Sequence, residues 1–195
     1  MPACRQAGIL QYRIAMKLLL HTCCAPCLIY PLEELKKKRF KVTGLFYNPN
    51  ISPLYEYDIR LNAVKDYSKD IKFDLIVHKN DCNNYLNLVA ADEEKPERCK
   101  ICWQMRLRET AQFAKDNNFD GFSTTLLVSP YQDQDLLKVV GEETARDIDI
   151  EFYFEDFRPG FRYAQELAKK QNLYRQKYCG CKYSELERCK KSVKP

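Results

Sequence analysis

The stretch that decides the fold is Lys17-Leu-Leu-Leu-His-Thr-Cys-Cys-Ala-Pro-Cys27. It begins with three leucines, which are typical of a short buried strand, and Pro26 suits the first turn of a helix because a missing N–H costs nothing there. The stretch therefore predicts a strand, a tight turn and a helix. In an open α/β sheet such a turn lies at the carboxyl end of a strand, where ligands bind. The turn carries three soft sulfur ligands, which favour a soft metal or redox chemistry: Cys23, Cys24 and Cys27.

Strands and helices are predicted to alternate along the rest of the chain. Four more apolar segments are expected to form strands, at residues 42–46, 73–77, 122–128 and 152–154. Apolar residues at helical spacing separate them, and the repeat of about 25–35 residues is typical of parallel βαβ units. We therefore expect a three-layer, doubly wound, Rossmann-like α/β domain with a mostly parallel five-stranded sheet, followed by a helical, Cys-containing C-terminal segment.

A chain of 195 residues predicts one domain, which we place at residues 16–195 because Met16 directly precedes the first strand. Residues 1–15 look unlike the rest, and we expect them to be a disordered or non-native extension. No apolar run approaches the roughly 20 residues needed to cross a bilayer, and the N-terminus is not typical of a secretory signal. We therefore expect a cytoplasmic protein without a membrane partner.

Ten cysteines in a reducing compartment favour metal binding or redox work over a disulfide framework. The segment Cys99-Lys-Ile-Cys102 is predicted at the N-terminus of a helix, where both sulfurs lie on one side of the first turn. Together with Cys23 and Cys24 it supplies four thiolates, enough for a four-cysteine zinc site or a 4Fe–4S cluster. Structural zinc sites usually have two separated pairs of ligands. Because Cys23 and Cys24 are adjacent, we favour the cluster.

A third pair of thiols is Cys179-Gly-Cys181. A disulfide in so small a ring would be strained and labile, which suits electron storage, and ligation of a second metal is the alternative. Cys27 lies near one turn into its helix, where it either reaches the same site or is a packed thiol. Asp81, Asp133 and Asp156 each follow a predicted strand, where a carboxylate either supplies a hard oxygen ligand or caps a helix.

Positive charge is concentrated at the C-terminal end of the chain. The net charge is +5, but residues 161–195 carry ten Lys/Arg against three Glu, so the remainder is slightly acidic. Tyrosines are interleaved with these cations, an arrangement that suits a phosphate backbone with unstacked bases. A solvated basic helix without a partner is the alternative. The tyrosines are Tyr163, Tyr174, Tyr178 and Tyr183.

Five motifs stand out: His21-Thr-Cys-Cys-Ala-Pro-Cys27, Tyr47-Asn-Pro-Asn50, Glu97-Arg-Cys-Lys-Ile-Cys102, Ser123-Thr-Thr-Leu-Leu-Val-Ser-Pro130 and Tyr174-Arg-Gln-Lys-Tyr-Cys-Gly-Cys181. Together they resemble the cobalamin-independent epoxyqueuosine reductase family, iron–sulfur enzymes of tRNA queuosine biosynthesis. The resemblance spans about residues 16–188. It implies an oxidoreductase that removes the epoxide oxygen of epoxyqueuosine at the tRNA wobble position, giving queuosine in the last step of its synthesis.

The resemblance also implies the roles of the thiols. The expected 4Fe–4S ligands are Cys23, Cys24, Cys99 and Cys102, and the expected redox-active disulfide pair is Cys179 and Cys181. An adjacent mononuclear iron is implied, with Cys27, Cys179, Cys181 and Asp133 as candidate ligands. The implied partners are the anticodon stem-loop of a tRNA that carries epoxyqueuosine and an electron-donor protein. A protein donor also agrees with the absence of the glycine-rich motifs that bind nucleotide phosphates.

Two further hypotheses fit part of the sequence. An iron–sulfur tRNA-thiolating enzyme on a similar α/β fold would need a phosphate-binding loop after the first strand, but the cysteine turn occupies that place. A zinc-stabilised RNA-binding module would use the same four cysteines without catalysis. Iron and acid-labile sulfide would be absent from such a module.

Overall fold

The computed structural model describes residues 15–79 and 81–192. It contains one five-stranded sheet in which every strand pair is parallel, in the order β3-β2-β1-β4-β5. This confirms the predicted doubly wound α/β fold. The prediction for residues 1–15 lies, apart from residue 15, outside the described residues. The strands are β1 Lys17–His21, β2 Lys41–Phe46, β3 Leu75–Val77, β4 Gly121–Thr124 and β5 Glu151–Phe152.

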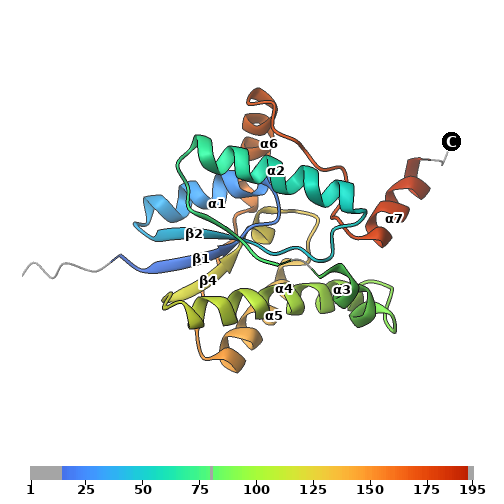
Figure 1. Cartoon of the computed structure of the whole chain (residues 1–195), viewed down its shortest axis with the longest axis horizontal. Coiled ribbons are helices and arrows are strands. Elements are labelled where there is room, and N and C mark those ends of the chain that lie inside the picture. The colour runs from blue at the N-terminus through green and yellow to red at the C-terminus, as the bar shows by residue number, and fades with distance from the viewer. Residues whose placement is uncertain (1–14, 80, 193–195) are drawn as a thin grey trace, which may run out of the picture.

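Helices cover both faces of the sheet (Figure 1). One face is covered by α1 (Ala25–Lys37), α2 (Leu54–Asp70) and α6 (Phe161–Lys170). The opposite face is covered by α3 (Cys82–Val89), α4 (Glu97–Asp116) and α5 (Gln134–Ile148). The last helix, α7 (Lys182–Ser192), lies beyond the carboxyl ends of the strands (Figure 1). No helix in the part of the chain that the structure describes is long and apolar enough to span a membrane.

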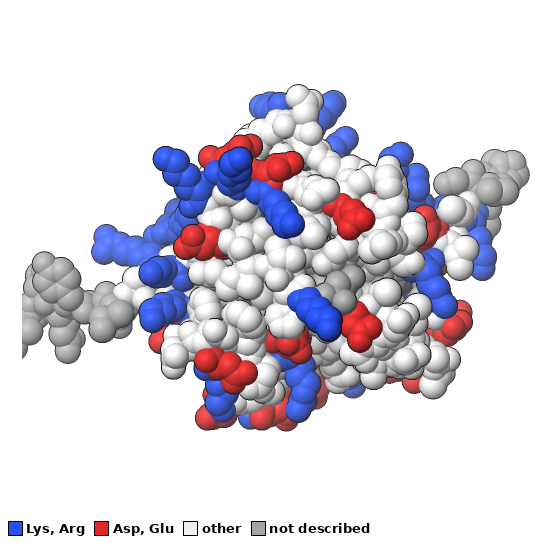
Figure 2. Space-filling view, viewed as in Figure 1, with Lys and Arg blue, Asp and Glu red and all other residues white. Residues whose placement is uncertain are grey.

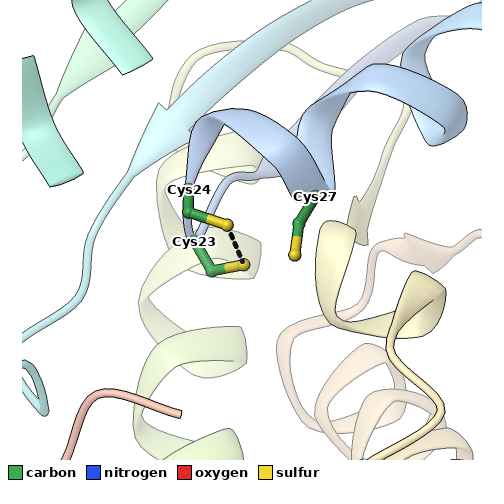
Figure 3. Close-up of side chains that lie close together, drawn as sticks. All are labelled: Cys23, Cys24 and Cys27. Carbon is green, nitrogen blue, oxygen red and sulfur yellow. Dashed lines mark hydrogen bonds between the residues drawn. The ribbon is translucent and has the colours of Figure 1, made fainter. Parts of the chain in front are cut away.

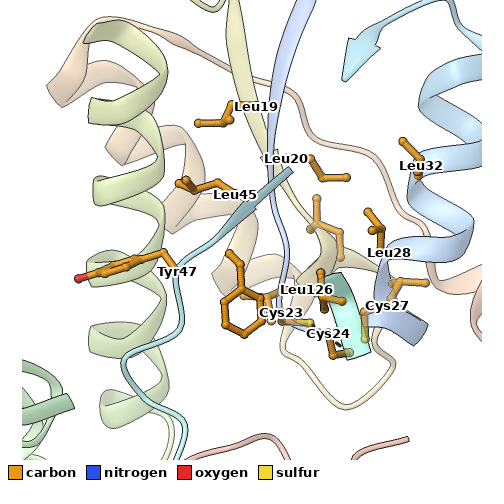
Figure 4. Packing of buried hydrophobic residues seen from close by; sticks show 14 of the residues in the cluster. Leu19, Leu20, Cys23, Cys24, Cys27, Leu28, Leu32, Leu45, Tyr47 and Leu126 are labelled. Carbon is orange, nitrogen blue, oxygen red and sulfur yellow. Dashed lines mark hydrogen bonds between the residues drawn. The ribbon is translucent and has the colours of Figure 1, made fainter. Parts of the chain in front are cut away.

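The core lies around β1, the central strand. Its leucines, Leu18 to Leu20, are completely buried, because a parallel strand with helices on both faces has no side that meets water. They pack with neighbours from β2 and α1, including Leu45, Leu28 and Leu32 (Figure 4). The cysteine turn sits at the edge of this core and is held in place by it.

The direction of strand order reverses at β1. From β1 the chain adds β2 and β3 on one side of the sheet, and it then crosses back to add β4 and β5 on the other side of β1. The connections that leave β1 and β4 therefore run in opposite directions. In open α/β sheets the crevice outside the carboxyl ends of two such strands is where ligands bind. Here those ends are His21 and Thr124, which are paired in register.

The segment after β4 differs from the prediction. A strand was expected over residues 122–128, but β4 ends at Thr124 and a 3₁₀ helix follows over Thr125–Val128. The Thr124 side chain accepts a hydrogen bond from Leu126 N (3.1 Å) and caps this turn. An apolar run does not distinguish a buried strand from a buried helical turn. The turn matters to the site because Thr125 Oγ1 accepts a hydrogen bond from Cys23 N (3.1 Å).

The C-terminal segment contains the predicted helix and cysteines, but Cys179 and Cys181 lie before α7, not within it. Residues 171–181 form a non-helical connection from α6 to α7. This connection crosses the carboxyl edge of the sheet and brings both cysteines to the crevice.

Candidate metal centre

The turn after β1 gathers three thiols. The sulfur atoms of Cys23, Cys24 and Cys27 all lie within 4.8 Å of one another, and each residue is at most 8% exposed. Cys24 has extended backbone before α1 and Cys27 lies in the first turn of that helix, so the three side chains point to the same side (Figure 3). We call residues 21–27 the strand-end wall. Its thiols are free and arranged to share one ligand.

The three thiols differ in acidity. Hydrogen bonds from Cys24 and then from Cys27 hold the pKa of Cys23 well below its usual value. Burial raises the pKa of Cys24, and its hydrogen bond to Cys23 raises it further. The pKa of Cys27 is likewise raised, first through its hydrogen bond with Cys23. Of the three thiols, Cys23 is therefore the one that its neighbours make easiest to deprotonate.

A cavity of about 890 Å³ opens in front of the strand-end wall. Thiols from three separate segments line it: Cys23 and Cys27 from the strand-end wall, Cys99 from α4, and Cys179 and Cys181 from the C-terminal connection. Cys24 is buried beside Cys23, and Cys102 is buried in a small cluster with Cys181. The structure thus brings the predicted cysteine motifs to one place. Whether they divide into cluster ligands and a redox pair remains a prediction.

The α4 cysteines are desolvated. Burial raises the pKa of Cys99 to about 11 and that of Cys102 to about 12. For Cys102, charge from Arg106 acts in the opposite direction. Both residues therefore stay protonated near neutral pH unless a metal or another positive charge stabilises their thiolates.

The second side of the cavity is the C-terminal wall, which we define as residues 174–181. Arg60 of α2 donates to the carbonyl oxygens of Cys179 and Tyr178, each at 3.0 Å, while its Nε donates to Glu56 (2.7 Å). Ser52 N donates to Gly180 O (2.8 Å). A buried ion pair therefore positions the backbone that carries Cys179 and Cys181.

Gly180 allows the tight path between the two cysteines. Its φ is +133°, a conformation that side-chain-bearing residues rarely adopt. A Cβ at this position would also lie 3.1–3.2 Å from atoms of Ile51, Arg60 and Asn50. The backbone between the two cysteines therefore requires a glycine at position 180.

Helix α7 is tied to the start of α4. Glu187 contacts Lys95 (2.9 Å) and the buried Arg98, and Tyr183 donates to Glu93 (2.6 Å). Burial acts to raise the pKa of Glu187, but the hydrogen bonds from Lys95 and Arg98 outweigh it and lower that pKa. These contacts hold the end of the chain against the helix that carries Cys99 and Cys102.

Asp133 is the one predicted carboxylate that lines the cavity. Its side chain also caps α5 by accepting from Leu136 N (3.0 Å), so both of its predicted roles agree with its position. Asp81 caps α3 by accepting from Asn84 N, and Asp156 pairs with Arg158 (2.6 Å). Neither of these two lines the cavity.

Three functional side chains were not anticipated from the sequence. Arg60 and Arg106 are buried beside the thiols, and Gln176 Nε2 lies 2.8 Å from Cys24 Sγ and 3.7 Å from Cys27 Sγ. A usable signal existed for the arginines. Each occurs on the buried face of its helix, four residues from a buried side chain, where a cation needs a specific partner.

The donor set fits a soft metal. Thiolate sulfur is the preferred ligand for zinc and for iron–sulfur clusters, and the described cavity offers thiols from three directions with buried guanidinium groups nearby. Guanidinium groups offset the negative charge that metal-bound thiolates carry. The site therefore suits an anionic metal–thiolate centre.

Comparison with solved structures identifies a similar fold. A solved structure from Methanocaldococcus jannaschii, described as a predicted subunit of tRNA methyltransferase, matches with a TM-score of 0.53 over 79% of this chain and 74% of that one. At 11% identity it shows a shared fold only.

Sequence relatives are more informative. A protein named epoxyqueuosine reductase QueH from Dehalococcoides mccartyi is 37% identical over 183 residues, covering 93% of this chain and all of the relative. One of the same name from Thermotoga maritima is 33% identical and covers 89% of this chain and 92% of itself. The family model described as "Epoxyqueuosine reductase QueH" matches residues 18–187, which include the cysteine motifs. The chain therefore belongs to the epoxyqueuosine reductase QueH family.

Proposed function

We propose that this protein is an epoxyqueuosine reductase, an oxidoreductase that converts epoxyqueuosine at the tRNA wobble position to queuosine in the last step of queuosine biosynthesis. The observation that carries the proposal is the convergence of thiols from residues 23–27, 99–102 and 179–181 on one cavity. At about 890 Å³, the cavity is large enough for a modified nucleoside. Family membership supports the same activity.

The thiols divide into two proposed groups. Cys23, Cys24, Cys99 and Cys102 would hold a 4Fe–4S cluster, and Cys27, Cys179, Cys181 and Asp133 are the candidates for an adjacent iron. Bound there, the cluster supplies single electrons and the iron supplies a Lewis acid. Cys23, Cys24 and Cys102 are buried and Cys99 is partly buried, which supports their assignment because solvent exclusion protects such a centre.

The two thiols of Cys179 and Cys181 can supply the electrons and protons that the reaction consumes. Removal of the epoxide oxygen as water, with formation of the alkene, consumes two electrons and two protons. Oxidation of two thiols to one disulfide releases two electrons and two protons. Both cysteines are free thiols that line the cavity, so the pair can supply one complete turnover before an external donor, proposed to be a protein, reduces it again.

The cavity suits a polyanion. Among its lining residues, six cationic side chains face two acidic ones: Arg60, Lys95, Arg98, Arg175, Lys177 and Arg188 against Asp133 and Glu187. Tyr131, also on the lining, is 84% exposed and offers a flat surface for an unstacked base. Lys and Arg side chains continue over α7 (Figure 2). These features support the anticodon stem-loop of a tRNA as the partner.

The proposed compartment is the cytoplasm. The nine cysteines in the described part of the chain are all free, which agrees with a reducing environment.

The test is a single-turnover assay. Anaerobically prepared, iron-loaded protein is incubated with tRNA that carries epoxyqueuosine and with dithionite, and the digested nucleosides are analysed by mass spectrometry. We expect queuosine to replace epoxyqueuosine. Cys181→Ser should still assemble the four-cysteine cluster, measured by its acid-labile sulfide, and fail to convert. If wild-type protein that contains iron and sulfide forms no queuosine, the proposed activity is wrong; if it contains zinc and no sulfide, the zinc-stabilised RNA-binding module gains support.

A further inference from the structure

Three arginines are buried in the described part of the chain, and one of them differs from the others. Arg60, Arg98 and Arg106 are each at most 2% exposed. Arg60 pairs with Glu56, and Arg98 pairs with Glu187. Arg106 has no carboxylate within 4.0 Å among the residues that the structure describes. A buried guanidinium without an anion is costly, so its charge calls for a partner.

The groups that touch Arg106 are neutral side chains. Its Nη2 donates to Asn48 Oδ1 (2.6 Å) and its Nε donates to His21 Nε2 (3.2 Å). Burial, followed by the charge of Arg106, lowers the pKa of His21 to about 3, so the imidazole is neutral. The remaining contact is Cys102 Sγ, 3.9 Å from Nη1. Hydrogen bonds therefore hold the guanidinium in place but do not neutralise it.

Among the side chains that the Arg106 guanidinium contacts in the described residues, only the Cys102 thiol can become anionic. The charge of Arg106 acts on Cys102, on Cys23 and on Cys179, which belong to the three segments that meet at the cavity. Arg106 thus contacts the thiol of Cys102, and its charge lowers the pKa of thiols in the other two segments. Negative charge builds up near Arg106 only when several of these thiols are deprotonated together. A bound metal causes this, because it binds the thiolate form.

We propose that Arg106 is the fixed counter-charge of the metal–thiolate centre, a positioning residue that stabilises the bound metal and favours its reduced state. This inference rests on the proposed function for the identity of the metal, but the charge argument applies to any thiolate-bound metal. Metal binding by four thiols makes the site more negative, and reduction adds another negative charge, so a nearby cation favours both.

The inference also gives a role to Asn48, in the motif Tyr47-Asn-Pro-Asn50. Asn48 Nδ2 donates to Thr22 O (2.9 Å), and Oδ1 is thereby aimed at Arg106. A carboxamide orients the guanidinium while leaving its charge available. A carboxylate in the same place would neutralise it.

The experiment compares cobalt(II) affinity, measured by sulfur-to-cobalt charge-transfer absorbance, with the midpoint potential of the iron-loaded protein. For Arg106→Gln we expect about 10–100-fold weaker cobalt binding, the usual effect of removing a residue that supports metal ligands, and a more negative potential. Arg106→Lys keeps the positive charge, so its cobalt affinity and midpoint potential should be close to those of wild type. The matched control is Arg108→Gln, an exposed arginine of the same helix that pairs with Asp147.

A second variant separates the electrostatic role from a structural one. Asn48→Asp supplies Arg106 with an internal carboxylate but loses the hydrogen bond to Thr22 O, so we expect a smaller gain in melting temperature on cobalt loading than in wild type. A purely structural role predicts the same loss with and without cobalt, and therefore an unchanged gain. This variant also serves if Arg106→Gln does not fold.

The outcomes are distinguishable. Wild-type cobalt affinity and an unchanged potential in Arg106→Gln, or an unchanged cobalt response in Asn48→Asp, would overturn the inference. If wild-type protein fails to assemble an iron cluster but the variants weaken cobalt binding as expected, the proposed cofactor is wrong while the role of Arg106 is supported.

Discussion

The strand-end wall and the C-terminal wall face the same cavity but are built in different ways. The strand-end wall comes from one short stretch, in which a central strand, a turn and a helix place three thiols through backbone geometry. The C-terminal wall has no helix or strand. Arg60, more than a hundred residues away, donates to its backbone, and the Tyr178 hydroxyl of the wall donates to Ser52 O. The first wall is therefore part of the core, whereas the second depends on a few individual contacts.

The largest effect is expected in the strand-end wall. Cys24→Ser removes a buried proposed ligand and should abolish stable iron binding, because serine is a poor ligand for a soft metal. Iron analysis and visible absorbance after anaerobic reconstitution measure this. Cys82→Ser, at an exposed cysteine, should retain wild-type iron. Equal iron in Cys24→Ser and wild type would contradict the ligand assignment.

A second substitution should loosen the C-terminal wall alone. Arg60→Met leaves Glu56 buried without its partner, so we expect a loss of about 3–5 kcal/mol in the free energy of unfolding and faster tryptic cleavage at Lys177. The double variant Arg60→Met with Glu56→Gln should regain part of the lost free energy of unfolding, because the buried carboxylate is replaced by a neutral amide. Urea unfolding and timed proteolysis test this, with Arg146→Met as an exposed control. Unchanged cleavage at Lys177 would show that Arg60 does not hold the wall.

Gly180→Ala tests the backbone between the two cysteines. We expect a loss of about 1–3 kcal/mol, because alanine is strained at positive φ and its Cβ would crowd Arg60 and Asn50. Urea unfolding gives the stability, and thiol titration after oxidation checks whether the proposed disulfide between Cys179 and Cys181 forms to the same extent as in wild type. A fully stable variant with unchanged disulfide formation would rule out this role of the glycine.

The smallest expected effect involves Glu187. Its pKa is lowered in the folded protein, so its contacts with Lys95 and Arg98 contribute stability above the ordinary glutamate pKa and lose it as pH falls through the lowered value. Glu187→Gln should therefore be slightly less stable than wild type at pH 7, and the difference should shrink in acid. Melting temperatures at pH 7 and pH 4 measure this. A difference that grows in acid would reverse the assignment.

The contrast between the walls also explains what could be predicted from the sequence. The strand, turn and helix around Cys23 follow from local patterns, and the alternation of strands and helices correctly predicted the parallel sheet. The 3₁₀ helix at Thr125–Val128 was missed because its residues are buried and mostly apolar, as the residues of a buried strand would be. Helical spacing places Arg60 and Arg106 on the buried faces of their helices, but the contacts of Arg60 with Cys179 O and of Arg106 with Asn48 are tertiary and no local pattern specifies them.

The position of the C-terminal wall at the end of the chain has a consequence for biosynthesis. A chain leaves the ribosome from its N-terminus, and domains fold as they emerge. All five strands and the cysteines of residues 23–27 and 99–102 are complete once residue 152 has been made. Cys179 and Cys181 arrive later, with the segment that covers the cavity. Translation order therefore completes the strand-end wall before the second side of the cavity has been made.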